Sequence, residues 1–212
     1  MDKKGILIVV SGFSGAGKGT LMKKLLEDYS GYALSVSATT RAPREGELHG
    51  KDYYFISRDE FTGMIRDNRL YEYTEYQNNY YGTPRAYVDE MLASGKDVIL
   101  EIEVMGAENI KKQFPDTVLV FVTPPSAEEL RRRLLGRGSE TPEKVRGRLM
   151  RALQEADYMD RYDYILVNDD IDVCVKELHN LICTEHLRMS RRSELCGRMK
   201  RELESLNGRR EQ

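Results

Sequence analysis

The most informative segment of the chain is residues 10–20, which read VSGFSGAGKGT. It fits the pattern G-x-x-x-x-G-K-S/T at Gly12, Gly17 and Lys18, except that Gly19 stands where the pattern has a hydroxyl and Thr20 follows one place later. An apolar run precedes it and a segment with helical spacing follows. In such a loop the backbone N–H groups turn inward around phosphate oxygens at the start of a helix. The order of strand, loop and helix therefore predicts a nucleotide phosphate site. The residues expected to line it are Gly12, Phe13, Ser14, Gly15, Ala16, Gly17, Lys18, Gly19 and Thr20.

Charge and cysteine content limit the possible partners. The chain has 212 residues and a net charge of −2, so no overall positive field points to nucleic acid. No apolar run approaches the 18 residues of a membrane span, and the first four residues lead directly into an apolar run, which leaves no room for a signal peptide. The three cysteines have spacings that suit neither a metal site nor a disulfide framework. We expect a cytoplasmic protein with no nucleic-acid or membrane partner.

Apolar runs and helical segments alternate along the chain, which predicts an α/β fold of the P-loop type. In this three-layer fold, a five-stranded parallel core sheet lies between helices. The strands are expected at 6–10, 32–37, 97–102, 117–122 and 164–167. Ser57-x-x-Glu60 and Ser126-x-x-Glu129 read as capping boxes, and Thr83-Pro84 and Thr141-Pro142 as a helix cap followed by a first-turn proline.

Two segments interrupt this alternation. One is rich in tyrosine and charge and predicts an insertion with its own small mixed sheet, and the other is rich in arginine and predicts a helical lid. The expected division is a core at 1–37, 83–125 and 156–190, an insertion at 38–82, a lid region at 126–155 and a charged helical tail at 191–212.

Several motifs outside the glycine loop resemble guanylate kinases, and the resemblance covers about residues 5–188. They are SATTRAPREGE at 37–47, GKDY at 50–53, NYYGT at 79–83, PPS at 124–126, RLLGRG at 133–138 and VNDD at 167–170. The resemblance implies a GMP-binding insertion and transfer of the γ-phosphoryl group of ATP to GMP, with Mg²⁺, in purine nucleotide metabolism.

The resemblance also implies which residues bind GMP. Arg41, Arg44, Tyr53 and Tyr81 would hold its phosphate, and the guanidinium forks suit a phosphate monoester. The carboxylate of Glu72 would accept hydrogen bonds from N1–H and the exocyclic amine of guanine, a donor pair that adenine lacks. Ser37 and Thr83 correspond to positions near guanine O6.

Glu101, Ile102 and Glu103 end the third apolar run, at the carboxyl end of a predicted parallel strand, where ligands collect. Alternation along the strand would place both carboxylates on one face and Ile102 on the other. The family commonly has aspartates at these two positions, the first directed toward magnesium through water and the second toward guanine. Thr20 is a second candidate near the metal.

The remaining assignments concern the transferring phosphoryl group. The resemblance implies that Lys18 reaches the β- and γ-phosphates and that Asn168 lies near the adenine end of ATP. The expected catalytic residues are Lys18, Arg41, Arg133, Arg137 and Arg148, because phosphoryl transfer requires positive charge around the transferred group. The other arginines of this region are expected to be solvated. They are Arg131, Arg132, Arg146 and Arg151.

Two alternatives remain beside this reading. Gly19 gives the loop the G-K-G-T ending of adenylate kinases. The first alternative is therefore an AMP-specific kinase, although Glu72 and the insertion motifs argue against it. A non-catalytic guanylate-kinase-like binding module is the other, although such modules typically lose the loop lysine or the lid arginines. The sequence does not distinguish a monomer from a homo-oligomer, nor GMP from dGMP as the acceptor.

Overall fold

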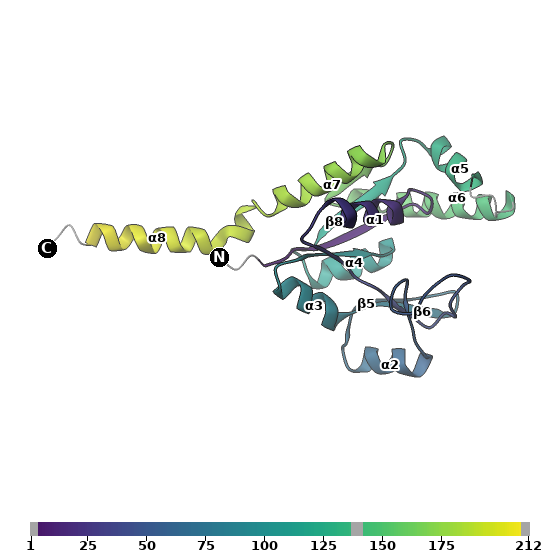
Figure 1. Ribbon diagram of the computed structural model, residues 1–212, viewed down its shortest axis with the longest axis horizontal. Helices are drawn as coiled ribbons and strands as arrows, with labels where there is room; N and C mark the ends of the chain where they lie inside the picture. Colours follow the sequence, from purple (N-terminus) through teal and green to yellow (C-terminus); the bar gives the residue numbers. More distant parts are fainter. Residues whose placement is uncertain (1–3, 137–141, 209–212) are drawn as a thin grey trace.

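The core is a parallel sheet of five strands in the order β2-β7-β1-β8-β9, in a computed structural model that describes residues 4–136 and 142–208 (Figure 1). All neighbouring strands in it run parallel. The strands are β1 (Leu7–Gly12), β2 (Tyr32–Leu34), β7 (Asp97–Glu101), β8 (Val118–Thr123) and β9 (Tyr164–Val167). The predicted α/β fold and its five-stranded parallel sheet are confirmed.

Each face of this sheet is covered by helices because successive strand residues point to opposite faces. Ile8 and Val10 pack with α1 (Lys18–Asp28) and α7 (Ile171–Glu185), whereas Leu7 and Val9 pack on the other face with α3 (Arg85–Ala93) and α4 (Val104–Gln113). The chain thus forms the predicted three layers, and the carboxyl ends of β1 and β7 lie beside each other, with Val10 paired to Glu101.

A second, mixed sheet of four strands has the order β4-β3-β6-β5. Its strands are β3 (Ala38–Thr39), β4 (Tyr54–Phe55), β5 (Leu70–Tyr76) and β6 (Asn79–Pro84). Helix α2 (Arg58–Arg66) packs on it through the buried Phe61 and begins with the predicted capping box of Ser57 and Glu60. The small mixed sheet predicted for the insertion is confirmed, and Figure 1 shows it beside the core with α2 on its outer side.

The predicted helical lid corresponds to α5 (Ala127–Leu135) and α6 (Pro142–Ala156). Ser126 accepts the expected hydrogen bond from the Glu129 backbone, but the Glu129 carboxylate binds Arg132 and Arg133 on its own helix, so this capping box is only half formed. Thr141, the other expected cap, lies outside the described residues. The lid arginine Arg137 does so as well.

Thr83 does not cap α3, contrary to prediction. The residue that precedes this helix is Pro84, and α3 begins at Arg85. The Thr83 hydroxyl instead donates to the buried carboxylate of Glu72, at 2.8 Å. A buried carboxylate needs hydrogen-bond donors more than an exposed helix end does, because water satisfies the latter.

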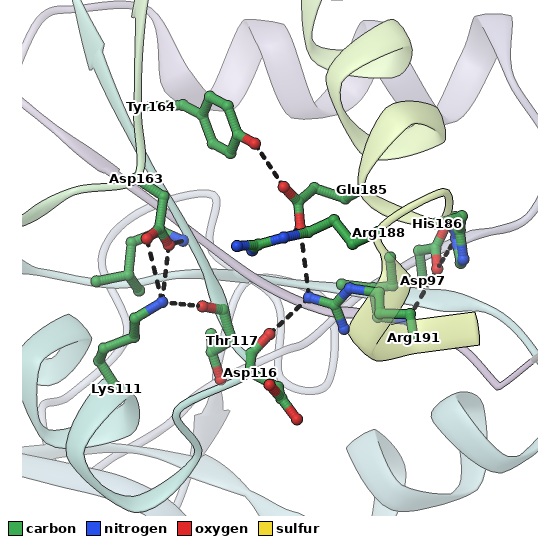
Figure 2. Close-up of polar contacts among 12 residues, drawn as sticks. Asp97, Lys111, Asp116, Thr117, Asp163, Tyr164, Glu185, His186, Arg188 and Arg191 are labelled. Carbon is green, nitrogen blue, oxygen red and sulfur yellow. Dashed lines mark hydrogen bonds and ion pairs between the residues drawn. The ribbon is translucent and has the colours of Figure 1, made fainter. Parts of the chain in front are cut away.

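The end of α7 is fixed to the sheet by a network of charged groups (Figure 2). The buried carboxylate of Glu185 accepts hydrogen bonds from Tyr164 and Arg188 and also pairs with Arg191. Asp97, at the start of β7, binds both the Ile6 backbone N–H and the His186 ring. Beyond this anchor, η2 (Met189–Arg192) leads into α8 (Ser193–Gly208), which extends away from the core in Figure 1.

A short 3₁₀ helix, η1 (Met159–Arg161), links α6 to β9. No helix among residues 4–136 and 142–208 is both long enough and apolar enough to cross a membrane.

Candidate active site

The glycine loop lies between β1 and α1, and its geometry requires glycine at two positions. A side chain on Gly12 would lie 2.1 Å from the Val122 carbonyl oxygen. Gly17 has a φ of 90° and forms the N-cap of α1, so its backbone N–H and the N–H groups that follow it can face an anion. Lys18 Nζ donates to the Gly12 carbonyl at 2.7 Å and to the Phe13 carbonyl at 3.3 Å, which places the ammonium group over the loop.

Asn168, the residue directly after β9, binds the backbone of this loop. Its side chain is 5% exposed, and Nδ2 donates to the Ala16 carbonyl at 2.8 Å. A side chain on Gly17 would lie 2.5 Å from the same nitrogen. The residue expected near the adenine end of ATP thus also fixes the backbone of the phosphate loop.

Gly19 and Thr20 occupy the exposed first turn of α1. A Cβ on Gly19 would meet no atom within 4 Å. The helix therefore accepts a side chain at position 19, and glycine is not required there by packing.

Arg41 lies in an aromatic corner of the insertion. Its guanidinium carbon is 5.4 Å from the centroid of the Tyr53 ring, and the Tyr53 and Tyr81 rings are 6.1 Å apart. Both terminal nitrogens of Arg41 donate to the Glu47 carboxylate at 2.9 Å, and this carboxylate also accepts the Arg44 backbone N–H at 2.7 Å. The structure therefore brings Arg41, Tyr53 and Tyr81 together, while the Arg44 side chain is exposed.

Glu72 is the buried carboxylate of the site, with 6% of its surface exposed. Burial raises its pKa to about 7, and the hydrogen bond from Thr83 opposes this rise. A side chain on Gly106, in the first turn of α4, would lie 3.0 Å from Glu72 Oε2. Glu72 therefore lies against the beginning of α4 with one oxygen bound to Thr83. Ser37 directly precedes β3, which β6 separates from the strand that carries Glu72, and it is partly buried.

The two carboxylates after the third apolar run lie in different elements, contrary to the expected alternation. Glu101 is the last residue of β7, but Glu103 is the N-cap of α4. The strand ends one residue earlier than predicted, because the backbone turns into α4 immediately after it. Partial removal from water raises the pKa of Glu101, and the nearby Lys18 ammonium opposes this rise. Glu101 therefore lies near the phosphate loop.

The lid reaches the loop through Arg148. Its Nη1 donates to Ser14 Oγ at 2.8 Å, across 134 residues of sequence. Arg133 is partly buried and pairs with Glu129, with Nε 2.7 Å from Oε1. Arg148 therefore contacts the glycine loop, and Arg133 is held on α5 by a carboxylate.

Two residues that were not predicted lie beside the site. Arg151 pairs with Glu103 at 2.7 Å and with Glu155 at 3.0 Å, so it is not simply a solvated arginine. Burial raises the pKa of Glu155, and Lys18 and Arg151 are among the charges that act on it. The spacing of Arg151 and Glu155, four residues apart on a predicted helix, is a signal that could have indicated this pair.

The site thus combines a glycine loop that carries a lysine at the start of a helix with an arginine of α6, and the insertion adds a buried carboxylate and an arginine beside two tyrosines. A family model described as "Guanylate kinase" matches residues 4–185 of this chain. The chain belongs to the guanylate kinase family. A guanylate kinase of Lactococcus lactis subsp. lactis (strain IL1403) is 50% identical over 191 residues, which are 90% of this chain and 93% of that protein.

A solved guanylate kinase has the same fold. The crystal structure of guanylate kinase from Anaplasma phagocytophilum superposes with a TM-score of 0.73 and 34% identity, and the match covers 90% of each chain. The resemblance to guanylate kinases that the insertion motifs indicate is therefore confirmed over most of the chain.

Proposed function

We propose that this guanylate kinase family member transfers the γ-phosphoryl group of ATP to GMP, giving ADP and GDP. The observation that carries the acceptor's identity is the buried carboxylate of Glu72, which lies 2.8 Å from Thr83 in an insertion that also holds Arg41, Tyr53 and Tyr81. A carboxylate at this position can accept hydrogen bonds from N1–H and from the exocyclic amine of guanine. Adenine offers no such donor pair, and its binding would leave the buried carboxylate with Thr83 but with no donor from the base.

In this reaction an oxygen of the GMP phosphate attacks the γ-phosphorus of ATP, and the bond to the β,γ-bridging oxygen breaks. ADP leaves with the electron pair of that bond, so no covalent enzyme intermediate is needed. Lys18 and the lid arginines Arg133, Arg137 and Arg148 would stabilise the negative charge that spreads over the transferred group. No side chain has to act as a general base, because the phosphate monoester is already largely dianionic near pH 7.

Magnesium fits this site as an ion carried mainly by ATP oxygens and water. Among residues 4–136 and 142–208, no group of three or more histidine, cysteine, aspartate or glutamate side chains is arranged to hold a metal. The chain instead offers Glu101 at the end of β7 and the Thr20 hydroxyl in the first turn of α1. Mg²⁺ retains several waters and usually takes one or two protein ligands, so Glu101 through water and Thr20 would suffice. When bound, it neutralises charge on the phosphates of ATP.

We further infer a cytoplasmic enzyme of purine nucleotide metabolism, with ATP and GMP as small-molecule substrates and with no nucleic-acid or membrane partner. The near-zero net charge and three free cysteines, two of them exposed, support this assignment. The domain division at 38–82 and 126–155 belongs to the same proposal: each segment would serve one substrate, GMP for the first and ATP for the second.

Steady-state ADP production, measured with ATP and Mg²⁺ and with GMP, dGMP, AMP, CMP or UMP as acceptor, tests the proposal. We expect rapid turnover with GMP and none with AMP. Turnover with AMP alone would contradict the assignment of Glu72. A folded protein that binds GMP but turns over no acceptor would instead be a non-catalytic binding module.

A further inference from the structure

Arg151 is a single side chain that joins three parts of the molecule. It stands on lid helix α6, and its Nη2 lies 2.7 Å from Glu103 Oε1, at the N-cap of core helix α4. Its guanidinium carbon lies 4.7 Å from the centroid of the Tyr76 ring, at the end of β5 in the insertion. Its Nε lies 3.0 Å from Glu155 on its own helix. One guanidinium group therefore connects the lid, the core and the insertion.

The ion pair is at the guanine end of the site, because Glu103 and Glu72 lie at the same end of α4. Glu103 is the N-cap, and Glu72 lies against Gly106 in the first turn of this helix. Burial is the main cause of the raised pKa of Glu72, and the charge of Glu103 adds to it. Two carboxylates that face one base repel each other unless a cation neutralises one of them. Arg151 is the cation bound to Glu103.

We propose that Arg151 is a positioning residue for guanine recognition, which holds Glu103 toward the 2-amino group and fixes α6 to the insertion through Tyr76. The inference rests on the proposed function, because it requires that Glu103 contact the base.

A guanidinium group suits this task better than an ammonium group. Its central carbon lies over the Tyr76 ring while two different nitrogens bind two carboxylates, and this fixes the orientation of Glu103 as well as its charge. An ammonium group would retain the charge but not the planar fork that binds both carboxylates. The pair is partly open to water, since the Arg151 and Glu103 side chains are 32% and 49% exposed, so its contribution is modest.

The experiment compares GMP with inosine 5′-monophosphate, which retains N1–H and O6 but lacks the 2-amino group. The full-length wild type, Arg151→Ala, Arg151→Lys, Glu103→Ala and the double variant Arg151→Ala/Glu103→Ala are each measured for kcat and KM with both acceptors. Arg146→Ala is the matched control, because Arg146 is an exposed arginine of the same helix with no assigned role. Circular dichroism and thermal melting report the folding of each variant.

We expect Arg151→Ala to reduce the preference for GMP over inosine monophosphate about threefold to fivefold, the range for a partly exposed ion pair. The change should appear in KM for GMP and not in KM for ATP. Arg151→Lys should recover part of the preference, and Arg151→Ala should have no further effect once Glu103 is alanine. Arg146→Ala should behave as the wild type.

A preference that stays unchanged in Arg151→Ala, or an equal loss of activity with both acceptors, overturns the inference and leaves Arg151 a structural residue. So does a full Arg151→Ala effect in the Glu103→Ala background. A wild type that does not phosphorylate GMP would contradict the proposed function itself, which the same series detects first.

Discussion

Thr83 donates its hydroxyl hydrogen to Glu72 at 2.8 Å, and both side chains are almost completely removed from water. One hydrogen bond does not compensate a carboxylate for the loss of its hydration, so burial raises the pKa of Glu72 to about 7. Glu72 is thus divided between its neutral and ionised forms near pH 7 before a base binds. Guanine, which offers two donors, binds the ionised form.

KM for GMP is therefore expected to rise as the pH falls from 8 to 6. Below the pKa of about 7, each pH unit lowers the ionised fraction of Glu72 up to tenfold, and KM rises by about the same factor. The phosphate of GMP also titrates in this range, so Glu72→Gln provides the background, because it retains an acceptor for Thr83 but has no charge. An identical pH dependence of KM in wild type and Glu72→Gln would contradict this assignment.

The same group makes folding stability depend on pH. The folded-state pKa of about 7 is above the ordinary value of 4.5 that applies in the unfolded chain, so the contribution of Glu72 is most favourable below pH 4.5 and is lost as the pH rises through 7. At pH 8 we expect Glu72→Gln to be more stable than the wild type, by at most about 3 kcal/mol. Urea unfolding of both proteins at pH 5 and pH 8 measures this, and a stability difference that does not grow with pH would argue against it.

A further prediction concerns GMP binding and Glu47. The Glu47 carboxylate binds both terminal nitrogens of Arg41 and the Arg44 backbone N–H. Glu47 thereby fixes both the guanidinium of Arg41 and the turn that follows it. Glu47→Ala should raise KM for GMP about tenfold, the effect of losing one charged hydrogen-bond network, with KM for ATP unchanged. Glu45→Ala, an exposed neighbour, is the control. Equal KM values for GMP in the two variants would show that Arg41 needs no such support.

Most of the fold could be predicted because it follows from local patterns. The five apolar runs give the parallel sheet, and the glycine loop appears between the expected strand and helix. The site was less predictable, because its side chains bind residues that are distant in the sequence. Thr83 reads as a helix cap until Glu72 is found beside it, and Glu103 is expected to share a face with Glu101 by strand alternation until the strand is found to end at Glu101.

Arg151 shows the same limit most clearly. From the sequence it is one arginine among several on a charged helix. Glu155 is the only acidic residue three or four positions away from it. Its other partners, Glu103 and Tyr76, are 48 and 75 residues away in the chain and come from different layers. No local pattern reports such a contact, and a single sequence gives only the residue types that permit it.

The two glycines around Lys18 should respond oppositely to the same substitution. Gly17 has a positive φ, and its side chain would lie 2.5 Å from Asn168 Nδ2, so Gly17→Ala must displace the amide that holds the Ala16 carbonyl. We expect this variant to lose ATP turnover by about a hundredfold or more, comparable with the loss of a preorganised anion site. Gly19 is helical with open space around it, so Gly19→Ala should retain kcat and raise the free energy of unfolding by about 0.5–1 kcal/mol. Coupled ADP assays and urea unfolding of the pair measure both effects. Loss of turnover in Gly19→Ala would show that the phosphates or their magnesium approach the helix more closely at position 19 than the packing of the loop indicates.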